Sequence, residues 1–311
     1  MSSNLIERLQ KTDRLPSAPG IALEIVRLSQ AEEVELPNIV EVLKLDPALV
    51  TKLVRTANSV MFGIPRRVTS VREAVIVMGV RTVNLLALSF SLVKLAKETS
   101  ELGFDYTRYW TYSIATNVGA RFLAQERTPR LRDEAFLTGL LCRLGQLVLV
   151  EWVPEEYGPV LEQLEQTKRP LADIEREVLG MTNAEVTRNL LDTWGLPPLI
   201  CEALGAQDDP SRLEAGHTRT LAEILHVATT CADLYTGGNV EMLVERLGTC
   251  AASYFDMSLE DCNGLLGEIE RQVPEAAQLY ELDSADPEEL AELRTTAEEL
   301  LLAVGNEEKP E

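Results

Sequence analysis

Residues 46–81 read DPALVTKLVRTANSVMFGIPRRVTSVREAVIVMGVR and carry several helix signals in one block. Asp46 is a helix N-cap, and the proline after it suits the first helical position. Apolar residues then recur three or four positions apart, as on one face of a helix. Ser70 and Glu73 form a capping box that opens a second helix, and Gly79 stands where a left-handed C-terminal cap belongs. The block therefore predicts two short helices joined by a tight loop.

The same signals recur outward along the chain, whereas strand signals are nearly absent. Thr182 and Glu185 make another capping box, and that helix is expected to close at residues 194–195. Residues 81–98 predict a further, more buried helix. The best strand candidate, residues 145–153, continues the helical stripe that precedes it. The sequence therefore predicts an all-α fold.

The composition limits the classes of function. With 311 residues and 45% hydrophobic residues, the chain is long enough for one large domain or two smaller ones. A formal net charge of -21 disfavours binding to nucleic acid or to an anionic membrane surface. The longest apolar run, residues 85–95, is too short to span a bilayer, and the first residues do not resemble a signal peptide. Five cysteines without a CxxC pair favour a reducing, cytoplasmic location.

Positive charge is concentrated in the opening block, in contrast to the acidic whole. Six basic residues face one acid there: Lys52, Arg55, Arg66, Arg67, Arg72 and Arg81 against Glu73. A second cluster has four arginines and one acid: Arg121, Arg127, Arg130 and Arg132 against Glu126. Such regions attract an anionic ligand or an acidic protein surface.

Four residues of the first cluster's loop are candidates for binding a partner or ligand. Arg66 and Arg67 lie between the two capped helices, where a guanidinium can make paired hydrogen bonds to a carboxylate or phosphate. Asn58 and Ser59 end the preceding helix and are the other two candidates. The alternative is structural, because Asn and Ser also satisfy helix-end carbonyls and loop amides, and nearby arginines also pair with surface carboxylates.

Four stretches together resemble one family, the HDOD domains, bacterial signalling-output domains related to HD-type phosphohydrolases. These stretches are LPSAPGIALEIVRL, the block quoted first, EAFLTGLLCRLGQLVLVEW and LGMTNAEVTRNLLDTWGLPPLICEAL. The resemblance implies an HD-like, all-helical domain of two packed lobes, without the hydrolase's catalytic apparatus and with a regulatory role. It divides the chain into an N-terminal segment (1–14), an HDOD-like domain (15–235) and an acidic helical extension (236–311).

The positions that hold metal in the HD hydrolases are altered in this sequence. Where these relatives carry His-Asp, the chain has Cys142-Arg143, and Arg143 would put a permanent positive charge where a dication sits. A further His of the relatives is Asn183, and a His-rich segment is replaced by residues 205–208. Asp233 alone matches a ligand position, and one carboxylate cannot hold a divalent metal. We expect no metal, no cofactor and no catalytic residue.

Other chemistries have weaker support. His217 and His226 are nine residues apart, so they do not share a helical face. His226 is interpreted as an ordinary helix residue. Cys142 could be a nucleophile with a pKa lowered by Arg143, but the leucines around it favour a buried thiol.

The sequence thus predicts a non-catalytic, cytoplasmic signal-transduction adaptor that acts through contacts with other signalling proteins. The alternatives are a nucleotide or cyclic-dinucleotide sensor without turnover and a residual metal-dependent phosphohydrolase. No nucleic acid and no membrane is expected as a partner, and the oligomeric state is left open. The acidic segment 281–311 could serve as a movable arm or cover the basic block.

Overall fold

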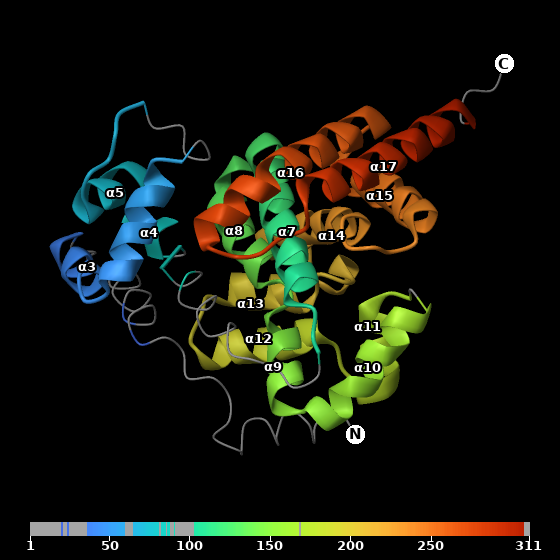
Figure 1. Cartoon of the computed structure of the whole chain (residues 1–311), viewed down its shortest axis with the longest axis horizontal. Helices are drawn as coiled ribbons and strands as arrows, with labels where there is room; N and C mark the ends of the chain where they lie inside the picture. Colours follow the sequence, from blue (N-terminus) through green and yellow to red (C-terminus); the bar gives the residue numbers. More distant parts are fainter. Residues whose placement is uncertain are drawn as a thin grey trace. The chain divides into compact units, whose positions relative to one another are not determined.

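A computed structural model describes residues 20, 24, 36–59, 65–80, 82–84, 86, 87, 90, 103–167 and 169–307, the last four by their backbone alone (Figure 1). Across these ranges every regular element is a helix and no strand occurs. The predicted all-α class is therefore confirmed.

The chain forms two compact units. The small unit contains α3 (Leu36–Leu43), α4 (Pro47–Ala57), α5 (Val71–Met78) and residues 279–281. The large unit spans residues 100–278 and 282–311. Its helices are α7 (Tyr106–Arg127), η1 (Pro129–Leu131), α8 (Arg132–Leu141), α9 (Leu144–Trp152), α10 (Pro154–Thr167), α11 (Leu171–Leu179), α12 (Asn183–Thr193), α13 (Pro198–Gly205), η2 (Pro210–Arg212), α14 (His217–Leu234), α15 (Val240–Phe255), α16 (Leu259–Tyr280) and α17 (Pro287–Glu307). The predicted boundaries of the HDOD-like domain at residues 15 and 235 do not coincide with these units and stay a prediction.

The helices of the small unit begin where the sequence predicts. The Asp46 side chain accepts hydrogen bonds from the amides of Ala48 and Leu49, and Ser70 Oγ accepts one from the Glu73 amide. Gly79 has a positive φ of 85° but an extended ψ of 149°, so it is not the predicted left-handed cap. The reason is that its carbonyl already accepts a bond from the amide of Val83, in the next helical stretch.

The predicted helix over residues 81–98 lies partly outside the described residues. Its described residues are all helical and buried: Thr82, Val83, Asn84, Leu86, Ala87 and Phe90.

Helix α7 runs through the core of the large unit, where it packs against α8 and α14 (Figure 1). Its residues from Tyr109 to Ala120 are all buried. Helix α8 comes very close to it, because a Cβ at Gly139 would lie 2.6 Å from the Asn117 Cα. Glycine is what permits this close packing of the two backbones.

The predicted single apolar stripe over residues 134–153 is two helices, α8 and α9, separated at Cys142 and Arg143. The described segment 129–152 is apolar and long enough to cross a membrane, but 83% of its apolar 18-residue window is buried inside the protein. The break turns α9 toward α12. There Gly145 donates its amide hydrogen to Thr187 Oγ1 at 2.8 Å.

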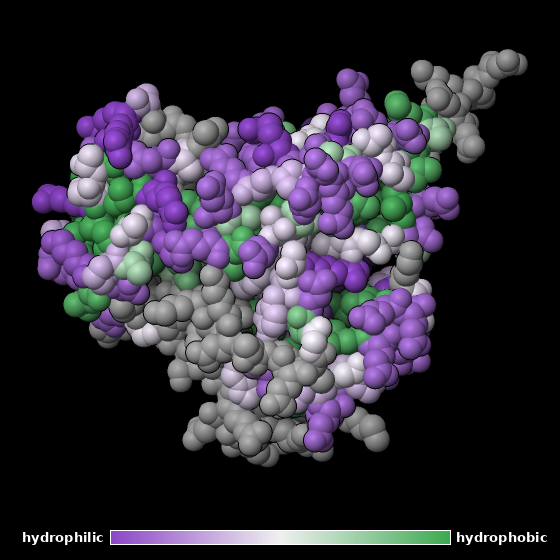
Figure 2. All heavy atoms as spheres, in the orientation of Figure 1, coloured by the Kyte–Doolittle hydropathy of each residue, from purple (hydrophilic) through white to green (hydrophobic). Residues whose placement is uncertain are grey.

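The acidic C-terminal helix α17 packs against α15 and α14. Leu290, Ala297 and Leu301 are its buried stripe, and its other face is polar. Hydrophilic residues cover much of the face drawn in Figure 2, with smaller patches of hydrophobic residues between them. Helix α17 is thus an integral part of the large unit, which argues against the suggested movable arm.

Candidate functional site

Asn58 joins the end of α4 to the end of the loop before α5. Its Nδ2 donates to the carbonyls of Val54 and Val68, both at 2.8 Å, and its Oδ1 accepts from the Val68 amide at 2.8 Å. Ser59 Oγ donates to the Thr56 carbonyl at 2.8 Å. Asn58 therefore holds the loop's backbone in place and Ser59 satisfies a carbonyl at the end of α4, as in the structural alternative, and their role toward a partner stays a prediction.

Replacing Asn58 by alanine is expected to lower the free energy of unfolding by about 1–2 kcal/mol, because three hydrogen bonds to loop and helix-end groups are lost at an exposed site. Urea denaturation measures the change. Thr51→Ala, at an exposed position of the same helix, is the control and should cost well under 1 kcal/mol. An Asn58→Ala variant as stable as the wild type would contradict the structural role.

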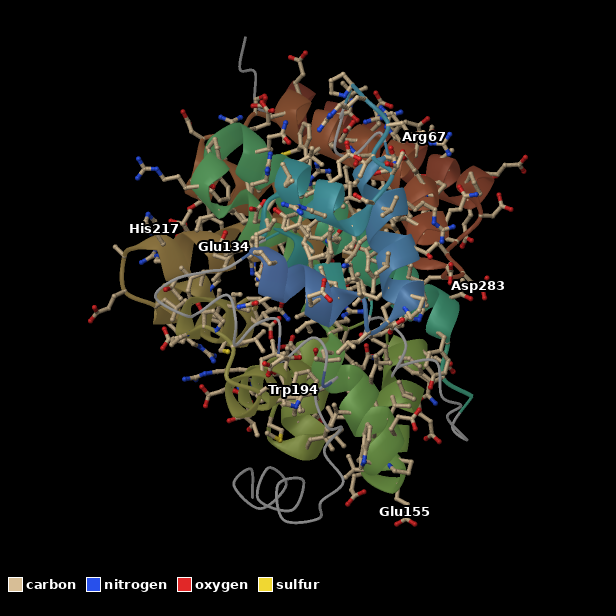
Figure 3. All side chains as sticks on the ribbon, turned by 90° about the vertical axis from the view of Figure 1, so that its left-hand side faces the viewer. Arg67, Glu134, Glu155, Trp194, His217 and Asp283 are labelled. Atoms are coloured by element: carbon tan, nitrogen blue, oxygen red, sulfur yellow. The ribbon has the colours of Figure 1, made fainter. Side chains whose placement is uncertain are left out.

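The arginines of this region have different surroundings. Arg66 and Arg67 are both exposed, and Figure 3 shows Arg67 on the loop before α5. The Arg66 Nη2 lies 3.3 Å from Glu73 Oε1. Arg55 Nη2 pairs with Glu281 at 2.7 Å, and Lys52 also reaches Glu281, at 3.2 Å. Lys52, Arg55 and Arg66 are thus each paired with a carboxylate, and both loop arginines, Arg66 and Arg67, remain exposed.

A second candidate site lies in the large unit, at the former metal position. Arg143 Nη2 donates to Asp233 Oδ1 at 3.0 Å. Its guanidinium stacks on the Tyr112 ring, 3.2 Å from the ring centroid. Burial opposes its charge, but Tyr112 and Asp233 outweigh that effect and raise the pKa of Arg143. The arginine therefore stays charged next to the one carboxylate that matches a hydrolase ligand.

Cys142, the residue before Arg143, is fully buried. Its carbonyl accepts a hydrogen bond from Gln207 Nε2 at 2.8 Å. Burial raises the pKa of the thiol to about 12, and the opposing effect of Arg143 does not cancel it. At neutral pH the group is a protonated thiol, which is a poor nucleophile.

Asn183, at another former ligand position, belongs to a buried polar cluster. Its backbone amide and its Nδ2 donate to Glu175 Oε2 at 2.7 and 2.9 Å. Tyr157 donates its hydroxyl hydrogen to Glu175 Oε1 at 2.7 Å. Burial raises the pKa of the Glu175 carboxyl to about 7, although these hydrogen bonds oppose the shift.

Sequence reasoning did not single out Glu175 or Tyr157. A signal was present for Glu175, which lies four residues after Leu171 and one after Ile174, on the buried face of α11. A carboxylate on a buried, apolar face needs a hydrogen-bond or ion-pair partner. Tyr157 carries no comparable signal.

The two histidines have different roles, and neither is placed to bind metal. The ring of His226 is buried, its Nδ1 lies 2.8 Å from the Gln207 carbonyl oxygen, and Arg246 Nη2 lies 3.3 Å from its Nε2. Burial and the Arg246 charge lower the pKa of His226, which favours the neutral ring. His217 is exposed at the start of α14 (Figure 3).

The side chains at the former metal position do not fit a divalent cation. In the described ranges no three His, Cys, Asp or Glu side chains converge. The guanidinium of Arg143 occupies the place beside Asp233, and Asn183 is engaged by Glu175. A cation there would face a fixed positive charge, with one carboxylate to bind it.

The all-helical fold places the protein in the HD-like class. The HDOD domain model matches residues 15–210, and the chain belongs to the HDOD family. An uncharacterized protein of Treponema pallidum (strain Nichols) is 27% identical over 202 residues, which are 64% of this chain and 38% of that protein. The chain thus spans well under half the length of this relative.

Solved structures show the same fold. An HDOD domain protein of unknown function from Geobacter sulfurreducens aligns with a TM-score of 0.63 and 23% identity, over 97% of this chain and 96% of that one. A "Putative signal transduction protein" from Marinobacter aquaeolei VT8 aligns with a TM-score of 0.66 and 26% identity, over 88% of this chain and 61% of that one. A "Putative phosphohydrolase" from Shewanella amazonensis SB2B aligns with a TM-score of 0.63 and 22% identity, over 98% of both chains.

Proposed function

We propose that this protein is a non-catalytic, cytoplasmic regulator of bacterial signal transduction that acts by binding other signalling proteins. The observation that carries the proposal is the Arg143–Asp233 ion pair, which places a guanidinium where a hydrolase of this fold needs a cation. Membership of the HDOD family supports a regulatory role. Among the described residues no three His, Cys, Asp or Glu side chains are grouped so that they could hold a metal ion, which gives the residual phosphohydrolase no support.

The catalytic half of the proposal is tested by a phosphodiesterase assay on protein purified without chelator, with added Mn²⁺ or Fe²⁺. We expect no cleavage above the buffer rate and no stoichiometric metal in elemental analysis. Cleavage of a nucleotide or cyclic dinucleotide that disappears on chelation would overturn it.

For the binding half, we propose Arg66 and Arg67 as contacts for an acidic surface of the partner. Both side chains are exposed and lie on a loop that Asn58 holds in place. An arginine fork suits a carboxylate, and a basic region in an acidic protein speeds association with an acidic surface.

Reversing both charges, Arg66→Glu with Arg67→Glu, is expected to reduce partner capture at least tenfold in a quantified pull-down from the native host. Arg212→Glu with Arg271→Glu is the matched control. It makes the same change in net charge at two exposed arginines and should leave capture unchanged. Equal losses in both double variants would show that net charge, and not this loop, governs binding.

A further inference from the structure

The large unit contains a cavity of about 330 Å³ beside the former metal position. Its walls come from the starts of α7, α9, α11 and α15, the ends of α10 and α14, and residues 236–239 between α14 and α15. This volume is at the lower end of the range of small-molecule sites. The cavity is therefore large enough for a compact metabolite.

Four arginines line this cavity against three carboxylates, in a protein whose overall charge is -21: Arg108, Arg143, Arg169 and Arg246 against Asp105, Glu165 and Asp233. Two of the carboxylates are engaged. Asp233 accepts from Arg143, and Asp105 accepts from the Arg108 backbone amide as the N-cap of α7. Arg169 pairs with Glu177 at 3.0 Å. Arg108 and Arg246 thus line the cavity without an ion pair among the described residues, whereas the charge of Arg143 is already paired with Asp233.

Arg108 has no ion pair within 4.0 Å among the described residues. Its guanidinium lies by the α14–α15 loop, since a Cβ at Gly237 would be 3.8 Å from its Nη2. Burial, followed by the charge of Arg143, lowers the pKa of Arg108. The two guanidinium groups repel each other across the cavity, and an anion between them would relieve that repulsion.

Gln146 provides the second, independent observation. It lines the cavity and is only 4% exposed, yet its Oε1 accepts no hydrogen bond from the described part of the chain. A buried amide oxygen without a donor costs free energy. A hydroxyl or amino group on a ligand would supply the missing hydrogen.

We propose that this cavity binds a small phosphate monoester that carries hydroxyl groups. Arg108 and Arg246 hold the phosphate, because planar guanidinium groups bind its oxygens through paired, charge-assisted hydrogen bonds. Gln146 Oε1 accepts a hydrogen bond from a ligand hydroxyl. The site belongs to the large unit, whereas Arg66 and Arg67 belong to the small unit, and it does not depend on whether the protein is catalytic.

Isothermal titration of the full chain with ribose 5-phosphate and with AMP tests this site and distinguishes a sugar phosphate from a nucleotide. Ribose is the uncharged control. We expect one of the two monoesters to bind at a 1:1 ratio and ribose not to bind. The proposal would be overturned if neither monoester gave heat of binding at about 10 mM. A dissociation constant of about 10 mM is the weakest affinity of interest.

Arg108→Ala is expected to weaken that binding about 10- to 100-fold, the effect of losing a charged hydrogen bond to phosphate. Because Arg108 is exposed, the variant should fold. The control is Arg271→Ala, an exposed arginine outside the cavity, which should bind like the wild type. Unchanged binding by Arg108→Ala would overturn the assignment.

Gln146→Met keeps the length of the side chain and removes the acceptor. The substitution should weaken the binding of ribose 5-phosphate or AMP about tenfold. It should leave the weaker binding of inorganic phosphate unchanged. An equal loss for inorganic phosphate would contradict the hydroxyl contact. Phosphate release from the bound ester would disprove the proposed non-catalytic function while the binding site would stand.

Discussion

Replacing Gly145 by alanine is expected to destabilise the large unit by about 3 kcal/mol. An added Cβ would lie 2.1 Å from the Asn183 carbonyl oxygen and 2.8 Å from the Thr187 amide nitrogen, both of them backbone atoms of α12. Backbone cannot rotate away as a flexible side chain does, so α9 and α12 must move apart. That movement also strains the bond from the Gly145 amide to Thr187 Oγ1.

The measurement is urea denaturation followed by circular dichroism. Gly264→Ala is the matched control, because Gly264 lies within α16 and a Cβ there would meet nothing within 4 Å. Alanine at this helical position should stabilise the protein by about 0.5–1 kcal/mol. A Gly145→Ala variant that loses less than 1 kcal/mol would show that the two helices are not in such close contact.

Gly145 also illustrates how far the sequence predicts the fold. Helix starts are encoded locally, since Asp46, Ser70 and Thr182 each cap a backbone amide within three residues, and these predictions are confirmed. The break between α8 and α9 is not encoded locally, because the apolar stripe continues through it. It follows from the approach of α12, some forty residues further along the chain.

The candidate sites show the same contrast. The resemblance to the HD hydrolases allowed Arg143 and Asn183 to be interpreted as replacements of metal ligands. Each residue stands at a known motif position. The cavity beside them could not be predicted, because its arginines come from α7, α9 and α15 and share no sequence spacing. Only the tertiary packing brings Arg108 and Arg246 toward Arg143.

Direct contacts between side chains join several helices of the large unit. The Arg143 side chain, just before α9, bonds to Asp233 of α14, and Asn183 of α12 bonds to Glu175 of α11. Glu175 is the member of these contacts whose pKa burial raises to about 7, so it makes this part of the fold sensitive to pH.

Replacing Glu175 by glutamine is expected to stabilise the protein by about 3 kcal/mol at pH 8 and to leave its stability nearly unchanged at pH 4.5. The unfolded chain releases this proton near pH 4.5, whereas burial keeps the folded carboxyl protonated up to a pKa of about 7. Between these values the folded state binds more protons than the unfolded state. The contribution of Glu175 to the free energy of unfolding therefore falls as pH rises from about 4.5 to about 7 and is constant above.

Glutamine reproduces the protonated carboxyl at every pH. Its oxygen can accept from the two Asn183 donors that now reach Oε2, and its amide can donate to Tyr157 where Oε1 now stands. Urea denaturation from pH 4.5 to 8 gives the free energy of unfolding of variant and wild type. The difference between the two at each pH isolates the effect of Glu175, because the contributions of the other carboxyls cancel. Glu177→Gln removes an exposed carboxyl from the same helix and controls for the loss of one charge. A Glu175→Gln variant less stable than the wild type at pH 8 would mean that the ionised carboxylate is the form this cluster stabilises.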